Sequence, residues 1–386
     1  MDSKITRRKA LQSLVTAAGA TFAAPMLNFG RFQLFGGTAE YSTRTIDLLG
    51  RSLVIDMLAP ISLNMKTLQS WLNTPETYTE KDHARFLESK IDVFHVAFGI
   101  GGPEAYNRTF QFISGLNNFL ANHDQLYMRI DSAADFERQH RTGKPALLLG
   151  VQNAEHFRKL DDVNSFHNMG QRVSQLTYNA RNMIGNGSTE RIDGGISDFG
   201  ARIIGRMDKV GMAVDVSHCG DQTTLDAFEI SKKPVLITHS NCRALAPGHP
   251  RCKTDEAIKK MAATGGVMGV TSVRMFVKND EPTTIEHYLD HFDHVAKLVG
   301  AEHLGVGSDI DLDGYDDLPA QVNQQLRANY KQGDYRFRDK IDIEGVDHPK
   351  RMFDLTEGLI RRDYSDGDIE GILGGNFKRA LVEIWK

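Results

Sequence analysis

The chain has 386 residues, of which 40% are hydrophobic and 25% are charged, and its formal net charge is −4. With 35 glycines and only 11 prolines, it has the composition of a soluble globular protein with a large core, which excludes disordered and collagen-like chains. The negative net charge offers no basic surface to a phosphate backbone, so we expect no nucleic-acid partner.

The first 27 residues have the order of an export signal. A basic cluster containing Arg7 and Arg8 precedes an acid-free run, residues 10–27, that is rich in Ala, Leu and Val. This order is typical of secretory signals, and the adjacent arginines resemble a twin-arginine signal. An ordinary secretory signal or an amphipathic arm would share much of this pattern. We predict a twin-arginine export signal at residues 1–27 and a periplasmic location.

The remaining chain shows neither a membrane span nor a disulfide framework. No stretch after the signal reaches the roughly 18 uninterrupted apolar residues that a span needs. The three cysteines, Cys219, Cys242 and Cys252, have no Cys-X-X-Cys spacing, and an odd count argues against a framework of bridges. A single bridge stays compatible with this count.

Short apolar runs recur along residues 28–386, and helix-like stretches separate them. Buried parallel strands give such continuous runs because both faces of the sheet are covered. Eight strands alternating with helices predict an α/β fold, a single-domain (β/α)8 TIM barrel rather than an open sheet. The predicted strands are 52–56, 92–98, 146–151, 172–178, 211–217, 234–240, 266–271 and 303–309.

Amphipathic stretches at 197–210 and 254–266 predict two of the helices; the second has Thr254 as its N-cap and glycines at its end. Two regions depart from the alternation. We expect residues 29–47 to pack across the barrel. The long polar segment 311–350 follows the last strand, and a loop of this length is more often an active-site cover than a linker.

Polar residues at the predicted strand ends are the candidates for chemistry, because catalytic groups of this fold project from the C-terminal ends of strands. His218, His239 and Asp309 lie at three such ends. Imidazole and carboxylate groups are the ligands of zinc-class divalent metals. One His at a strand end is more often a structural residue, but three candidate groups at one barrel mouth favour a metal or catalytic site.

The sequence around these residues contains five informative segments: DVSHCGDQTTLDAFEISKKPVLITHSNCRAL, HPRCKTDE, ATGGVMGV, LGVGSDIDLDG and ILGGNFKRALVEIW. Together they resemble the membrane (renal) dipeptidase family, zinc metallopeptidases of the amidohydrolase superfamily. The resemblance extends from about Leu53 to the C-terminus. It implies a barrel of the metal-dependent hydrolase type, a dipeptide-like or other small-molecule substrate, and a homodimer.

The resemblance also implies residue roles. His218 and His239 match the two histidine ligands of the family's second zinc. Asp309 matches the carboxylate that handles the proton of the nucleophilic water, and Arg251 matches the arginine that binds the substrate carboxylate. A guanidinium group suits this last role because it binds a carboxylate through two parallel hydrogen bonds.

Four positions depart from the family pattern. Leu58 and Pro60 stand where a His-X-Asp pair should hold the first metal, Gln152 replaces the bridging glutamate, and Tyr178 replaces the histidine that polarises the scissile carbonyl. A neutral amide cannot supply the negative charge that holds two dications together. We therefore predict at most one metal ion, zinc or another divalent ion, held by His218 and His239 with Asp309 and Gln152 as further candidates.

Other residues near the predicted strand ends allow more than one interpretation. Tyr178 is either a donor to a developing oxyanion or a rim aromatic with a satisfied hydroxyl. Asp56 is placed to face the site, whereas Glu155 and His156 are replacement ligands or, as we prefer, parts of a solvated loop. Cys219 and Cys242 fit small buried residues better than metal ligands.

Three functions are compatible with this set of residues. The first is a metal-dependent hydrolase acting on an amide or peptide bond of a small carboxylate-bearing molecule. The second is a lyase, isomerase or tailoring enzyme on the same site, and the third is a binding protein whose catalytic site has decayed. The fold alone does not separate them. The joint presence of His218, His239, Asp309 and Arg251 favours an enzyme, though one with doubtful activity on ordinary dipeptides.

Overall fold

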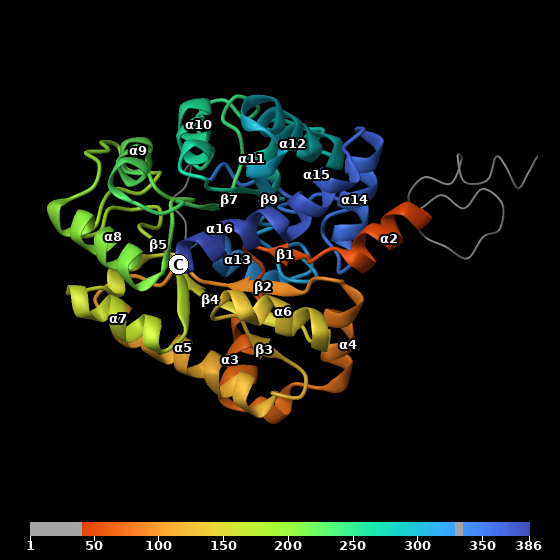
Figure 1. Cartoon of the computed structure of the whole chain (residues 1–386), viewed down its shortest axis with the longest axis horizontal. Coiled ribbons are helices and arrows are strands. Elements are labelled where there is room, and N and C mark those ends of the chain that lie inside the picture. Colours follow the sequence, from red (N-terminus) through yellow and green to blue (C-terminus); the bar gives the residue numbers. More distant parts are fainter. Residues whose placement is uncertain (1–40, 329–334) are drawn as a thin grey trace, which may run out of the picture.

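The structure is a computed structural model that describes residues 41–328 and 335–386. The predicted export signal at 1–27 lies outside these ranges. The described residues form a ring of parallel strands surrounded by helices (Figure 1). Within these ranges we find no helix long and apolar enough to cross a membrane.

Eight strands build the barrel, and they confirm the predicted fold. They pair in parallel in the order β6-β5-β4-β2-β1-β9-β8-β7, and β6 meets β7 through a parallel bridge between Asp215 and Leu236, which closes the ring. Each overlaps one predicted strand. They are β1 (Ile55–Asp56), β2 (Val93–Val96), β4 (Ala146–Val151), β5 (Gln171–Gln175), β6 (Ala213–Asp215), β7 (Ile237–Ser240), β8 (Met268–Val270) and β9 (Leu304–Val306).

A ninth strand, β3 (Met128–Arg129), pairs with the start of β4. The sequence did not predict it, because a two-residue strand is too short to show a periodicity.

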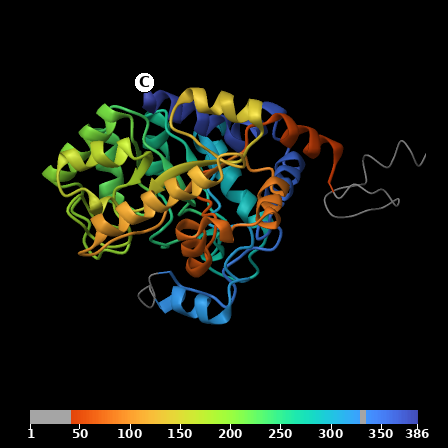
Figure 2. The ribbon, with the colours of Figure 1, turned by 90° about the horizontal axis from the view of Figure 1, so that it is seen from below.

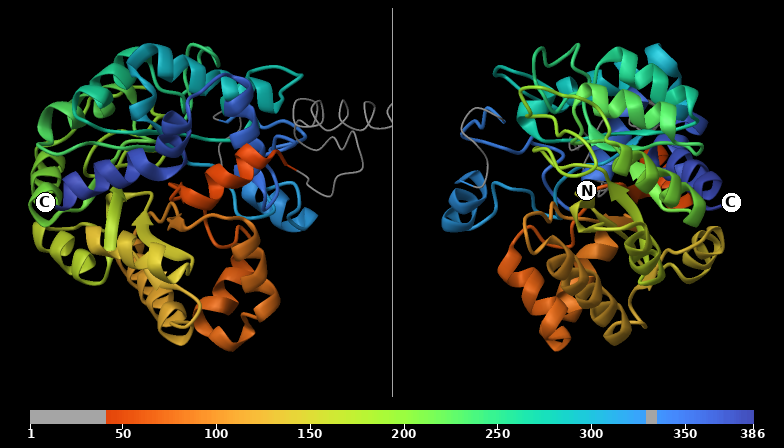
Figure 3. Two further views of the ribbon diagram at one scale, coloured as in Figure 1. Left: turned by 45° about the vertical axis from the view of Figure 1, so that its right-hand side comes forward. Right: turned by 90° about the vertical axis from the view of Figure 1, so that its left-hand side faces the viewer.

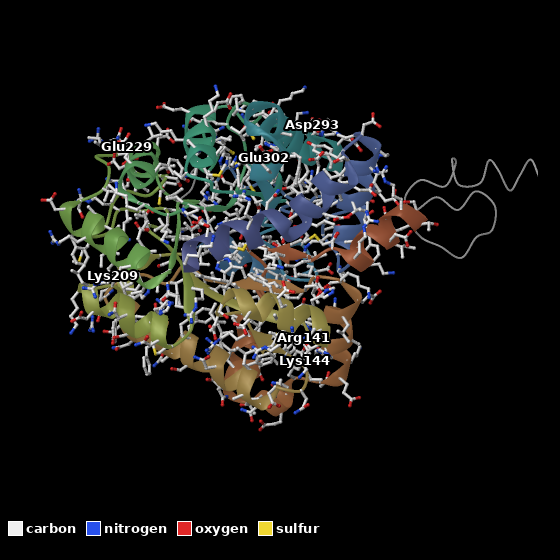
Figure 4. The ribbon with its side chains drawn as sticks, in the orientation of Figure 1. Arg141, Lys144, Lys209, Glu229, Asp293 and Glu302 are labelled. Carbon is white, nitrogen blue, oxygen red and sulfur yellow. The ribbon has the colours of Figure 1, made fainter. Side chains whose placement is uncertain are left out.

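Helices occupy the outside of the ring, and their polar faces carry the charge of the protein. In Figure 4, Lys209 on α8 and Glu229 on α9 point outward from this layer. The longer helices are α3 (Met65–Asn73), α4 (Glu80–Glu88), α5 (Ala105–Asn122), α6 (Ala133–Thr142), α7 (Leu160–Asn168), α8 (Asp198–Val210), α9 (Asp221–Ile230), α10 (Asp255–Ala263), α12 (Ile285–Val299) and α14 (Arg351–Arg361).

The two helices predicted by their amphipathic pattern are α8 and α10. Each starts where a side-chain oxygen can satisfy a free backbone N–H group of the first turn. Ser197 Oγ accepts from Gly200 N at the start of α8, and Thr254 Oγ1 accepts from Ala257 N at the start of α10.

The C-terminal helix α16 (Asn376–Trp385) lies across the centre of the ring in Figure 1. Its apolar residues Phe377, Leu381 and Ile384 join the inward-facing Ile55 and Val93 of the first strands in one buried cluster. These strand residues lie at the N-terminal ends of β1 and β2. This end of the barrel is therefore filled by apolar packing, which leaves the opposite end for polar groups.

Two regions with unusual sequence lie outside the ring. We predicted that segment 29–47 packs across the barrel, and the structure describes its residues 41–47. These residues lead into helix α2 (Thr43–Arg51), which packs against α14. The segment after β9 contains the short helix α13 (Ala320–Ala328), which stands away from the barrel in Figure 2.

The three cysteines are buried and free. The single bridge that their number allowed is therefore not formed.

Candidate active site

The structure brings His218 and His239 together at the C-terminal end of the barrel. His239 lies in β7, and His218 follows β6 by three residues. Both side chains are buried, and their Nε2 atoms are 3.0 Å apart. The ring of Tyr178, after β5, stacks on the His218 ring with centroids 4.1 Å apart.

The other nitrogen of each imidazole is fixed by an oxygen acceptor. His218 Nδ1 lies 2.8 Å from Asn179 Oδ1. His239 Nδ1 lies 2.8 Å from Thr238 Oγ1, whose own proton goes to Asp215 Oδ2 at 2.7 Å. Both Nδ1 atoms therefore donate, and both Nε2 atoms carry a lone pair. Burial, and next the positive charge of Arg251, hold the pKa of both imidazoles well below the usual range, so both are neutral.

This arrangement fits one metal ion. The two unprotonated nitrogens face each other at a distance of 3.0 Å. This distance is close to the separation of about 3.3 Å expected between two nitrogen ligands of a tetrahedral zinc ion. Among residues 41–328 and 335–386, however, no group of three or more His, Cys, Asp or Glu side chains is arranged to hold a metal. His218 and His239 would thus hold an ion whose remaining ligands come from other groups, water or substrate.

Asp309 lies beside this pair and lines the same small cavity as His218. Its backbone has φ +63°, a left-handed conformation in which Asp is among the tolerated residues, and its N–H donates to Leu58 O at 2.8 Å. Burial raises the pKa of Asp309 to about 7, with Arg251 opposing the rise and Asp56 adding to it. Near neutral pH, this carboxyl group can therefore both accept and return a proton.

The cavity between these residues measures about 30 Å³, the space of about one water molecule. Five of its ten lining residues are aromatic, and hydroxyl, imidazole and carboxylate groups lie among them, so an enclosed group would meet both polar and apolar surface. The walls are Tyr178, His218, Val273, Phe276, Asp309, Tyr315, Leu326, Tyr335, Phe337 and Ile341. The last part of this set comes from the 311–350 segment, which we predicted to cover the site.

Arg251 lies directly behind the histidine pair and is only 1% exposed. One terminal nitrogen donates to Ser217 O, the other to His239 O at 3.2 Å, and Phe276 lies 5.2 Å from the guanidinium carbon. In the described part of the chain its Nε–H has no acceptor. Arg251 therefore stabilises the two strand ends and retains one buried donor that is unpaired.

Gln152 and the two altered ligand positions supply no His, Cys, Asp or Glu side chain. The side-chain amide nitrogen of Gln152 donates to Ala97 O at 2.9 Å, and its Oε1 atom is the acceptor of this side chain. Leu58 and Pro60 are buried apolar residues.

Two further sequence interpretations, those of Asp56 and His156, need correction. Asp56 does not turn toward the histidines: its carboxylate accepts from Ser308 Oγ at 2.6 Å and pairs with Arg351 of α14 at 3.0 Å. His156 is fully buried rather than solvated, and Gln171 and the Asn153 carbonyl occupy its two nitrogens. Glu155 accepts from Gly102 N and Asn153 Nδ2. None of these residues joins the site.

Sequence reasoning missed the residues that orient the imidazoles. Asn179 bonds His218 and accepts from Tyr335 OH at 2.9 Å, across 156 residues of sequence. Asp215 and Thr238 form the corresponding support for His239. Their positions at the ends of β5, β6 and β7 were a usable signal, because this is where the fold gathers functional groups.

Comparison with known proteins agrees with the geometry. A family model described as membrane dipeptidase (peptidase family M19) matches residues 43–329. The chain belongs to this family.

Two curated relatives are fungal dipeptidases. Dipeptidase verJ of Clonostachys rogersoniana is 30% identical over 284 residues, covering 73% of this chain and 66% of that protein. Dipeptidase tcpJ of Claviceps purpurea is 27% identical over 280 residues, covering 72% of this chain and 60% of that protein. The matched region thus leaves at least a third of each relative without a counterpart.

Solved bacterial structures share the fold. An amidohydrolase from Pseudomonas aeruginosa superimposes with a TM-score of 0.75 at 27% identity, covering 88% of this chain and 99% of that one. A metallopeptidase from Rhodobacter sphaeroides, solved with a phosphinate mimic of the dipeptide L-Ala-D-Ala, has a TM-score of 0.70 at 17% identity and covers 86% and 99%. The second likeness is one of fold alone.

Proposed function

We propose that this dipeptidase-family hydrolase cleaves an amide or peptide bond in a small carboxylate-bearing substrate and uses one metal ion. The observation that carries the proposal is the pair of facing Nε2 lone pairs of His218 and His239, with Asp309 lining the same cavity. A zinc or other divalent ion bound there would polarise the carbonyl and lower the pKa of water. Within the residues that the structure describes, no comparable cluster of ligands suggests a second ion.

The protein's own groups would carry the proton transfers. Asp309, as carboxylate, accepts a proton from the attacking water while the new C–O bond forms at the carbonyl carbon. Tyr178 lies beside His218 and can donate a hydrogen bond to the oxyanion. When the C–N bond breaks, Asp309 returns its proton to the leaving nitrogen. A pKa of about 7 suits both transfers.

Arg251 and the walls of the cavity together suggest a substrate that combines a carboxylate with an apolar group. The unpaired Nε–H of buried Arg251 favours a carboxylate that supplies its acceptor. The aromatic walls favour an apolar or aromatic group next to the cleaved bond. The cavity of about 30 Å³ must enlarge before the carboxylate or the apolar group of a substrate can bind. The 311–350 segment forms the part of its wall that lies outside the barrel.

A screen of purified protein tests this proposal. We expect slow or absent cleavage of common L,L-dipeptides and of dipeptides with a C-terminal D-residue, and faster cleavage of N-acylated aromatic amino acids. Asp309→Asn is the control and should abolish turnover. Turnover of common dipeptides at about 10 per second or more, lost in the control, would show that other residues replace the missing ligands.

Reaction in ¹⁸O-labelled water separates hydrolysis from the second candidate, a lyase or isomerase that uses Asp309 to move a proton at carbon. Hydrolysis places one solvent oxygen in the carboxylate product. Turnover without incorporation would contradict the hydrolase.

The export signal at 1–27 leads us to propose a periplasmic location, which fractionation of cells expressing the full chain and an Arg7→Lys/Arg8→Lys variant would test.

A further inference from the structure

A second cavity, with a lining different from that of the cavity at His218, lies between helices α3 and α4 and the loop that follows β9. It measures about 380 Å³, which is within the size range of small-molecule sites. None of the described residues that line it also lines the cavity at His218. Helices α3 and α4 are the orange pair at the lower edge of the molecule in the left view of Figure 3.

The charged side chains in its wall are four aspartates and one arginine: Asp82, Arg85, Asp311, Asp313 and Asp317. Arg85 forms an ion pair with Asp313, which compensates one negative charge. The buried carboxylate of Asp311 is bonded to three backbone N–H groups of its surroundings, so it serves the structure of the loop. Within the described part of the chain Asp82 and Asp317 form no ion pair, although the charge of Asp82 also acts on Arg85.

Each of these two carboxylates has an oxygen that accepts no hydrogen bond from the described residues. Asp82 uses Oδ2 to cap helix α4 by accepting from Thr79 N at 2.9 Å, and within the described residues no hydrogen bond involves its Oδ1. Asp317 is exposed at the rim of the cavity and has no described partner. The wall therefore combines uncompensated negative charge with free acceptors.

The rest of the wall combines the polar residues Ser62, Asn64 and Thr67 with apolar and aromatic side chains. Trp71 of α3 lines the cavity and is held by an edge-to-face contact with Tyr78, whose centroid is 5.0 Å away. Ile61, Phe86 and Leu312 add apolar surface. An indole ring attracts a cation through its quadrupole, most strongly among the aromatic side chains.

A bare metal ion does not match these features. The aspartates of this wall do not converge, since no group of three carboxylate, thiol or imidazole residues in the described ranges is arranged to hold a metal. Separated carboxylates around an aromatic wall instead suit a cation that is itself extended. We propose that this cavity binds a small organic cation, an ammonium or guanidinium group carried on an apolar body.

Fluorescence of Trp71 tests the proposal directly, because the chain has only two tryptophans. Trp385→Phe removes the other; it keeps the stacking on Phe136, at 5.7 Å, and deletes an indole N–H that has no acceptor among the described residues. In this background we would titrate cyclohexylammonium, cyclohexanol and cyclohexanecarboxylate, which share one shape and differ in charge. The expected result is a saturable change for the ammonium, with affinity about tenfold or more above that of the other two.

Two charge variants complete the test. Asp317→Asn should weaken the ammonium by about threefold, the effect of losing one exposed ion pair. Glu256→Gln removes the same charge from α10, on another side of the barrel, and should leave binding unchanged. Equal affinity for the three probes, no saturable change with the ammonium, or equal weakening by both variants would each overturn the proposal. Calorimetry with the unsubstituted chain excludes an optical artefact.

Discussion

Among the residues of the site, Asp309 is the one whose protonation we expect to change the free energy of unfolding. Its pKa of about 7 in the folded protein exceeds the value of about 3.9 in an unfolded chain. A raised carboxyl pKa means that the folded state binds the proton more tightly. The contribution of Asp309 is therefore most favourable below about pH 4 and is lost as the pH rises through 7.

We predict that Asp309→Asn raises the free energy of unfolding at pH 8 by roughly 1 to 3 kcal/mol. The amide stays neutral and tolerates the left-handed backbone at this position. The gain should shrink as the pH falls from 8 toward 5, as urea unfolding with chelator present would measure. A gain that is independent of pH would remove the titration of Asp309 as its cause.

Arg251 offers a second test at the residue scale. Arg251→Lys replaces the fork with a single ammonium and should weaken a carboxylate substrate by roughly 1 to 3 kcal/mol, seen as a raised KM. Because Arg251 also donates to Ser217 O and His239 O, the variant needs a thermal unfolding control. An unchanged kcat/KM in a folded variant would exclude Arg251 from substrate binding.

Among the elements, β4 shows how close packing inside the barrel constrains the sequence. A Cβ atom on Gly150 would lie 2.0 Å from Nε2 of His95, which reaches over β4 from the neighbouring strand β2. His95 is buried, and its Nδ1 lies 2.6 Å from Met57 O, so the ring cannot turn away freely. Glycine is therefore required at this position by the neighbour.

We predict that Gly150→Ala destabilises the fold by about 1 to 3 kcal/mol, as overpacking of a filled core does. Gly205→Ala is the matched control: its Cβ meets nothing within 4 Å on helix α8, so it should stabilise by about 0.5 to 1 kcal/mol. The cost of Gly150→Ala should fall in a His95→Ala background. An equal cost in both backgrounds would show that the backbone, and not the imidazole, resists the change.

For the whole molecule, the decisive measurement is the number of bound metal ions. The pair His218 and His239 fits one ion, whereas Leu58, Pro60 and Gln152 occupy the positions that would hold and bridge another. We predict no more than one tightly bound divalent ion per chain, lost in His239→Ala. Native mass spectrometry with elemental analysis would measure both. Two ions per chain would contradict the prediction.

The sequence by itself determined the barrel and the ends of its strands. Eight continuous apolar runs were sufficient because strands covered on both faces show this pattern locally, and strand ends place His218, His239 and Asp309 at one mouth. The family could also be recognised from segments that are continuous in the chain.

Only the tertiary structure decided what each polar residue contacts. Asp56 precedes the altered ligand position closely in sequence, yet it pairs with Arg351, 295 residues away. His218 is oriented by Asn179 and, through it, by Tyr335. The direction of a side chain depends on which distant element packs against it, and one sequence carries no local signal of such a contact. For the same reason, the cavity beside Trp71 emerged only when α3, α4 and the loop after β9 came together.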